Sequence, residues 1–210
     1  MNRRELTRGE IEEAISNKYW DFGNDVLYRL CESNPAHDRD DVIIAKVWLI
    51  GRSYAATIER RRETDGIVGD KFYEDVVAPR IRTSAIDNWF QDLRNTQVSD
   101  LAQSLKTHQQ VVSLFRDICH EDKHSLASKY LHFHFPARFY IYDSRASKAI
   151  SALCGTTPPP NGFEDVYSCF FARCEELNRS VITPLFRRLS PREFDKVLLH
   201  EAAGISTAAG

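Results

Sequence analysis

Apolar residues recur along most of the chain at steps of three and four positions, which is the spacing of one face of an α-helix. The longest stripe consists of Val42, Ile43, Val47, Ile50, Tyr54 and Ile58. It predicts one amphipathic helix over residues 40–62, because Gly51 inside it costs only about 1 kcal/mol. Alternation of apolar and polar residues, the pattern of a strand, is rare. The chain is therefore expected to have an all-α fold of about ten short helices.

Residue type marks the starts of several predicted helices. Ser190, Pro191 and Glu193 combine a capping box with a proline at the first helical position, so the last helix is expected to begin at Pro191. Thr107 and Gln110 show the same box and predict another helix start. Such boxes satisfy backbone amides that have no partner inside the helix, and this is why they fix where a helix begins.

A proline-rich run, GTTPPPNG at residues 155–162, interrupts the helical pattern because proline has no amide hydrogen to donate. With 210 residues and a mass of 24.2 kDa, the chain has the size of one large domain or two small ones. We therefore predict a single all-α domain over residues 1–210, or two helical lobes, with residues 155–162 as a connector.

The composition is that of an ordinary globular protein, with 42% hydrophobic and 28% charged residues. The formal net charge of -2 excludes a uniformly basic binder of nucleic acids, so any such contact requires a local patch. One patch stands out between positions 123 and 148, where five cations accompany a single acid, Asp143. These cations are Lys123, Lys129, Arg138, Arg145 and Lys148. Phosphate contacts are expected in this segment.

The cysteines and the N-terminal residues indicate a reducing compartment. The five cysteines are an odd number without a CxxC pair, so neither a disulfide framework nor a zinc ribbon is indicated. The first residues, MNRRELTRGEIEEA, lack the apolar core of a signal peptide, and no apolar stretch approaches the ~20 residues that span a bilayer. We expect a cytoplasmic, monomeric protein without a membrane partner.

The most informative segment runs from Ser125 to Ile150 and reads SLASKYLHFHFPARFYIYDSRASKAI. Its helical spacing ends at Pro136, and residues 139–142 form a short aromatic stretch that we expect to be extended. Asp143 then stands where the next helix begins. The plain explanation of this aspartate is that its carboxylate accepts the first amides of that helix, which is worth about 1 kcal/mol.

Lys129 on one helix, a turn, aromatic residues and Asp143 at the start of the next helix together resemble the active-site segment of the helix-hairpin-helix DNA glycosylases. In that all-helical superfamily, a lysine of the bifunctional members lies at the start of the second hairpin helix, and an aspartate lies at the N-terminus of the next helix. The segment HEDKHSLASKYL lacks the family's glycine-rich turn. The lysine and the aspartate are 14 positions apart, fewer than is typical, and the iron-sulfur cysteines of some members are absent.

The resemblance implies a DNA glycosylase that flips a damaged or modified nucleotide out of the duplex and cleaves its N-glycosidic bond. Asp143 would stabilise the oxocarbenium-like sugar and position water, whereas attack by Lys129 on C1′ would add AP-lyase activity. The base pocket is expected to include Tyr142, Tyr140 and Trp89. DNA would be the partner, and no cofactor is expected. The expected DNA contacts are Lys123, Ser125, Ser128, Arg145 and Lys148. DNA repair is one setting for this activity, and the altered hairpin adds a specialised one, the removal of modified bases from phage DNA.

Other chemistry fits the sequence less well. His132 and His134 could share a metal ion only in an extended segment, because residues two apart on a helix point about 200° apart, and no metal is expected. Cys119 lies near two histidines, but nothing in the sequence activates its thiol. The motifs of phosphate loops, dinucleotide-binding folds and hydrolase elbows are absent.

A second class of function is a non-catalytic helical module that binds protein or nucleic acid. In such a module Asp143 only caps a helix and Lys129 is solvated. The two hypotheses differ in what they require of one carboxylate, because a helix cap needs a side-chain oxygen and the enzyme needs its negative charge.

Overall fold

The computed structural model describes residues 4–18, 20–60 and 66–208. This part of the chain is built from helices and contains no strand, which confirms the predicted all-α fold. None of its helices combines the length and the apolar character that crossing a bilayer requires.

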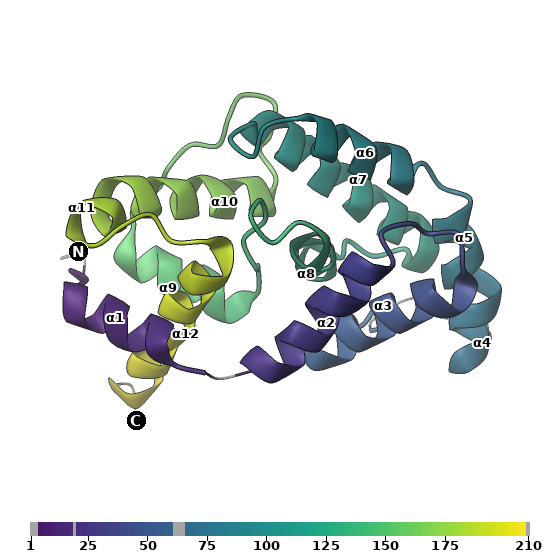
Figure 1. Ribbon diagram of the computed structural model, residues 1–210, viewed down its shortest axis with the longest axis horizontal. Coiled ribbons are helices and arrows are strands. Elements are labelled where there is room, and N and C mark those ends of the chain that lie inside the picture. Colours follow the sequence, from purple (N-terminus) through teal and green to yellow (C-terminus); the bar gives the residue numbers. More distant parts are fainter. Residues whose placement is uncertain (1–3, 19, 61–65, 209–210) are drawn as a thin grey trace. The chain divides into compact units, whose positions relative to one another are not determined.

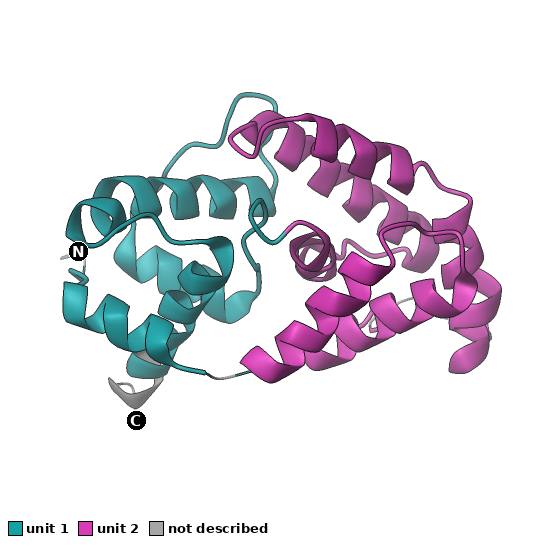
Figure 2. Cartoon of the chain, viewed as in Figure 1, with its two compact units in different colours: residues 1–20, 136–210 teal, residues 21–135 magenta. Residues whose placement is uncertain are grey.

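The chain divides into two compact units (Figure 2). Unit 1 consists of Met1–Trp20 together with Pro136–Gly210, and unit 2 consists of Asp21–Phe135. Unit 2 is thus one continuous stretch of sequence inserted into unit 1. The proline-rich run at residues 155–162 is non-helical and lies inside unit 1, where it connects two helices.

Unit 1 places its N-terminal helix and its C-terminal helix in one core. Its elements are α1 (Arg8–Ser16), α9 (Ser144–Leu153), α10 (Val166–Leu177), the π-helical turn η2 (Asn178–Ile182), α11 (Thr183–Leu185) and α12 (Pro191–Ala208). Helix α12 packs against both α1 and α9, and α9 packs against α10 (Figure 1). Phe194, Val197 and Leu198 of α12 are buried, as their helical spacing predicts.

The predicted start of the last helix is confirmed. The Ser190 amide donates to the Glu193 carboxylate at 2.9 Å, and the Glu193 amide donates to the Ser190 hydroxyl at 3.3 Å. Both arms of the capping box are therefore formed, and α12 begins at Pro191.

Unit 2 is built around helix α8. Its elements are α2 (Asp21–Ser33), α3 (Asp40–Ser53), α4 (Asp70–Phe72), the π-helical turn η1 (Tyr73–Val77), α5 (Ala78–Arg82), α6 (Ile86–Asn95), α7 (Leu101–Cys119) and α8 (His124–His134). Helix α8 packs against α2, α3 and α7, and every residue from Leu126 to Phe133 is buried. An 11-residue helix that is buried on all sides cannot show a single apolar stripe in its sequence.

The prediction of one helix over residues 40–62 is wrong, because α3 ends at Ser53. Ala55 adopts a left-handed backbone conformation with a φ of 50°, and the Ala56 amide donates to the Gly51 carbonyl at 2.8 Å. The chain then passes so close to Gly51 that a Cβ there would lie 3.1 Å from the Cα of Thr57. Glycine at this position permits the close approach without displacing Thr57. The apolar stripe therefore continues in the sequence past the point where the helix ends.

The predicted helix start at Thr107 is also wrong. Helix α7 begins at Leu101, where the Asp100 side chain accepts the Gln103 amide at 3.0 Å. Thr107 is completely buried in the middle of α7. The sequence pattern of a capping box at Thr107 and Gln110 therefore lies inside a helix and does not mark a helix start. The Thr107 hydroxyl is packed in the core.

Candidate functional site

Asp143 is the N-cap of α9, as predicted. Its Oδ1 accepts the backbone amides of Arg145 at 3.0 Å and Ala146 at 2.9 Å. Phe139 to Ile141, just before it, are buried and anchor the start of the helix in the core of unit 1. The carboxyl group itself is only half-buried, so it lies near the surface at the positive end of the helix dipole.

Tyr142 lies beside this carboxylate and is half-buried. Its ring meets those of Phe170 and Tyr167 edge to face, with centroids 5.2 and 6.2 Å apart. Burial, and then the neighbouring Asp143, raise the pKa of the Tyr142 phenol, which therefore stays neutral at physiological pH. An aromatic surface with a neutral hydroxyl next to a carboxylate is suited to hold a heterocyclic base.

Of the other two aromatic residues expected in a base pocket, one is buried in the core of unit 1 and one belongs to unit 2. Tyr140 is 2% exposed, and its hydroxyl donates to Glu175 Oε1 at 2.7 Å and accepts from Asn178 Nδ2 at 3.2 Å. It is thus a core residue of unit 1. Trp89 is a half-buried residue of α6 in unit 2.

Arg145 and Lys148 are both exposed on α9. They are three positions apart, so their side chains project from the same face of the helix. No residue of α9 is acidic. The surface of this helix after its N-cap is therefore positively charged.

A tight hairpin joins α7 to α8 in unit 2, and its turn consists of residues 120–123. His120 adopts the left-handed conformation with a φ of 58°, and its amide donates to the Arg116 carbonyl at 2.7 Å. Arg116 also forms an ion pair with Asp122 across the turn. The hairpin thus forms without a glycine, because a histidine accepts the backbone conformation that glycine adopts most readily.

Lys129 lies in α8 and is completely buried. Its ammonium donates to Ser125 Oγ at 2.8 Å and lies 5.6 Å from the ring centroid of Tyr54. Lys129 belongs to unit 2, whereas Asp143 belongs to unit 1. Within unit 2, the amino group of Lys129 is occupied by polar and aromatic neighbours of its own core.

The predicted DNA contacts of the hairpin differ in exposure. Ser128 is completely buried, and its hydroxyl donates to the Ser125 carbonyl at 3.0 Å, so its side chain offers no surface contact. Ser125 and Lys123 are half-buried. The Lys123 ammonium donates to the carbonyl of Arg60.

The residues weighed for metal or thiol chemistry have structural partners. His132 and His134 both lie in α8 and face different neighbours: His132 Nε2 lies 2.6 Å from the Tyr28 hydroxyl, and His134 Nδ1 lies 2.9 Å from the Tyr130 carbonyl. Cys119 is buried, and its thiol donates to a carbonyl one turn earlier in α7.

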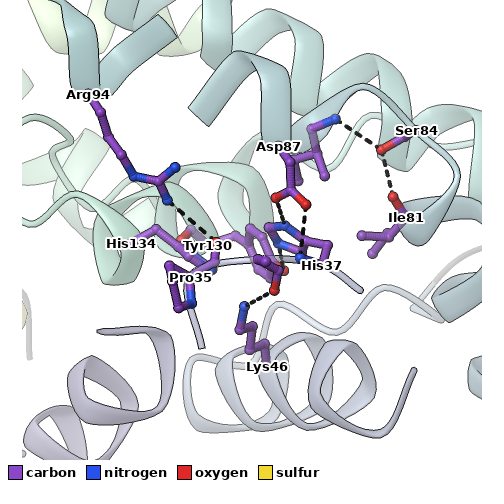
Figure 3. Close-up of polar contacts among 11 residues, drawn as sticks. Pro35, His37, Lys46, Ile81, Ser84, Asp87, Arg94, Tyr130 and His134 are labelled. Atoms are coloured by element: carbon purple, nitrogen blue, oxygen red, sulfur yellow. Dashed lines mark hydrogen bonds and ion pairs between the residues drawn. The ribbon is translucent and has the colours of Figure 1, made fainter. Parts of the chain in front are cut away.

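A polar cluster around His37 is buried in unit 2 and was not anticipated from the sequence (Figure 3). His37 Nδ1 lies 2.6 Å from Asp87 Oδ1, and His37 Nε2 lies 2.8 Å from the Tyr130 hydroxyl. The backbone amide of His37 also donates to Asp87 Oδ2 at 3.0 Å. Because an ionised carboxylate only accepts hydrogen bonds, Nδ1 carries the hydrogen and Nε2 accepts from the phenol.

Burial sets the charge states within this cluster. It lowers the pKa of His37 to about 4, and the ammonium of Lys46 acts in the same direction. Burial raises the pKa of Asp87, but the hydrogen bonds from His37 outweigh it, and the net shift is downward. At neutral pH a neutral imidazole therefore lies between a carboxylate and a neutral phenol.

Two cations complete the cluster. The Lys46 ammonium is completely buried and donates to the Ala36 carbonyl at 3.2 Å, and Arg94 donates to the Pro35 carbonyl at 3.4 Å. Together with His37 they hold the short link between α2 and α3 against the neighbouring helices (Figure 3). His37 and Tyr130 are 1% and 0% exposed, so no substrate reaches them, and we interpret the cluster as structural.

The sequence contains one signal for this cluster. Lys46 lies among the apolar positions of α3, between Ile43, Val47 and Ile50, and a charged residue in such a stripe needs buried partners. The partners themselves carry no local signal. His37 is 50 positions from Asp87 and 93 positions from Tyr130.

Comparisons with known proteins do not add to this picture. No protein-family model matches the chain, and searches of curated proteins and of solved structures find no significant match.

Proposed function

We propose that the protein is a DNA glycosylase in which Asp143 is the essential catalytic residue. The observation that carries the proposal is the position of this carboxylate. It is partly exposed at the start of α9, next to Tyr142 and two and five positions before the exposed cations Arg145 and Lys148. An acid, an aromatic surface and phosphate-binding groups are the three elements that this reaction requires.

The chemistry assigns a role to each element. Cleavage of an N-glycosidic bond builds positive charge on the deoxyribose, and a fixed carboxylate stabilises that charge. The helix amides that donate to one oxygen of Asp143 hold the carboxyl group in a fixed orientation. The flipped base stacks on Tyr142, and the cations of α9 hold the backbone of the strand from which it came.

The hairpin of unit 2 is also consistent with the proposal. The α7–α8 pair is a helical hairpin with a four-residue turn, the kind of element that glycosylases of the resembled superfamily use to bind DNA. Its turn carries Lys123 and is followed by the amides of the α8 N-terminus, which favour a phosphate oxygen.

The decisive experiment compares the protein with its Asp143→Asn variant. Duplexes that carry deaminated, oxidised, alkylated or hypermodified bases are incubated with each protein, and abasic sites are then cleaved with alkali. Asparagine still caps a helix but has no charge. We expect base release by the variant to fall by at least about 100-fold, with the folded state retained.

Asp165→Asn is the matched control. Asp165 caps α10 in the same way, with its Oδ1 accepting the amides of Tyr167 at 2.9 Å and Ser168 at 3.0 Å. It should retain base release. Equal loss of activity in both variants would show that the effect is common to charged helix caps and not specific to a catalytic carboxylate at Asp143, which would contradict its assigned role. No base release from any duplex by the unaltered protein would refute the proposal.

Water, rather than Lys129, is expected to be the nucleophile, because the Lys129 amino group is buried and bound to Ser125. Borohydride added during the reaction should therefore trap no protein–DNA adduct, and Lys129→Gln should still release the base if it folds. An adduct that forms with the unaltered protein and disappears in Lys129→Gln would instead establish a Schiff-base mechanism.

The competing function is a non-catalytic helical binding module. The specific observation that favours it is that Asp143 has a structural role as a helix cap. Its expectation of a solvated Lys129 is wrong, because Lys129 is completely buried and donates to Ser125 Oγ. This hypothesis predicts that Asp143→Asn behaves like the unaltered protein in every assay.

A further inference from the structure

Most arginines of unit 1 are neutralised within the unit. Those within salt-bridge distance of a carboxylate are Arg4, Arg8, Arg179, Arg187, Arg188 and Arg192. Arg145, Lys148 and Arg173 differ, because the described residues give none of them an ion pair. All three belong to the neighbouring helices α9 and α10.

Arg173 is held in place by a neutral group. Its guanidinium donates to the Ser151 hydroxyl at 3.0 Å, so α10 extends this cation over the last turns of α9. Its buried Nε has no hydrogen-bond partner. Arg173 is half-buried, so only the terminal nitrogens of its guanidinium are open to an external acceptor, and no carboxylate among the described residues forms a salt bridge with it.

The three cations form a row. Tyr142, just before α9, packs on Phe170 of α10, and Ser151 near the other end of α9 contacts Arg173, so the two helices run side by side in the same direction (Figure 1). Positions 145, 148 and 151 of α9 are three residues apart, which corresponds to about 4.5 Å of rise at each step. Arg145, Lys148 and the Arg173 guanidinium held at Ser151 thus follow one another along α9, a little less than one turn apart.

We propose that this row is a phosphate track, in which Arg145, Lys148 and Arg173 bind consecutive phosphates of one DNA strand. The inference rests on the proposed function and adds Arg173, positioned by Ser151, to the DNA contacts. Arg145 and Lys148 lie on α9, which has no acidic residue, and Arg173 reaches it from α10, where Glu175 and Glu176 pair with Arg188 and Arg179. A strand of phosphates complements such a line of cations. Asp143 repels phosphate at the first turn, so the track begins at Arg145 and leads away from the reacting sugar.

The test is the salt dependence of DNA binding. The affinity for a fluorescent duplex is measured by anisotropy over a range of NaCl concentrations, because each phosphate contact contributes about 0.9 to the slope of log K against log salt. We expect Arg173→Gln and Lys148→Gln each to reduce the slope by about 0.9. Arg173→Lys should keep the slope, since it keeps the charge.

Arg179→Gln is the matched control, because Arg179 follows α10 directly, is exposed and is paired with Glu176. For Arg179→Gln, the slope of log K against log salt should equal that of the unaltered protein. Circular dichroism of every variant verifies folding. Ser151→Ala, which keeps Arg173 but frees it, should weaken binding with little change of slope.

Three results would overturn the inference. Arg173→Gln could fold and keep the full slope of log K against log salt, Arg179→Gln could reduce that slope as much as Arg173→Gln does, or the unaltered protein could fail to bind the duplex. Its outcome is separable from that of the proposed function. Base release that depends on Asp143 together with an unchanged Arg173→Gln slope refutes only the track. A reduced slope without base release from any duplex refutes only the enzyme.

Discussion

His37 is neutral because its surroundings penalise a positive charge. It is 1% exposed, and Lys46, Arg94 and His134 face it from three different helices, while Asp87 is its one acidic neighbour in the cluster. The net effect lowers its pKa to about 4, and burial also lowers the pKa of His134 well below its ordinary value. We therefore expect these residues to make unit 2 less stable in acid.

The sign of this sensitivity follows from linkage. The unfolded chain protonates His37 near pH 6.5 and the folded chain only near pH 4, so the stabilisation is complete above pH 6.5 and decreases as the pH falls toward 4. We expect His37 to contribute a loss of about 2 kcal/mol in the free energy of unfolding between pH 7 and 4.5. Urea denaturation at both pH values measures it.

His37→Gln separates this residue from the rest of the chain. The variant should be less stable at pH 7, because Asp87 and Tyr130 lose a partner, but its stability should fall less steeply with acid. Curves of stability against pH that run parallel in the two proteins would contradict the assignment of a lowered pKa to His37.

At the scale of elements, the α7–α8 hairpin shows how a turn tolerates an unfavourable residue. His120 has a φ of 58°, where a side chain with a Cβ costs about 1–2 kcal/mol. The ion pair between Arg116 and Asp122 and the capping hydrogen bond of the His120 amide hold the turn closed. The absence of glycine from a turn in the sequence is therefore no evidence against a hairpin.

Replacing this histidine with glycine should stabilise the protein. His120→Gly removes the left-handed strain, and the greater freedom of glycine in the unfolded chain offsets part of the gain, so we expect a net increase of about 0.5–1 kcal/mol in the free energy of unfolding. Thermal denaturation measures the change. Glu121→Gly, at an adjacent exposed position without a positive φ, should be destabilising, and stabilisation by both variants would show that strain is not the cause.

At the scale of the whole molecule, the order of elements along the chain differs from their grouping in space. Unit 1 brings α1 together with α9 and α12, although unit 2 separates them in the sequence. The connector at residues 155–162 resembles a domain boundary in composition, but the chain passes between the units near residues 20 and 135. Proline marked a break in helical structure and carried no information about which helices share a core.

The sequence by itself determined the local features. It predicted the all-α class, the start of α12 at Pro191 and the cap of α9 at Asp143, because each depends on residues within one or two turns of each other. The helix predicted over residues 40–62 was too long. The chain leaves the helix where Thr57 packs closely against Gly51, and the spacing of apolar residues gives no sign of this contact.

Only the tertiary structure decided which polar groups are buried and which meet. Ser128 and Lys129 belong to a helix covered on all sides, and neither helical spacing nor charge distinguishes them from surface residues. His37, Asp87 and Tyr130 meet across long stretches of sequence. The pairing of charges is likewise a property of packing, and it is what leaves Arg145, Lys148 and Arg173 without an acid partner among the described residues. Periodicity records the near neighbours of a residue, whereas burial and partners depend on helices that are remote in the chain.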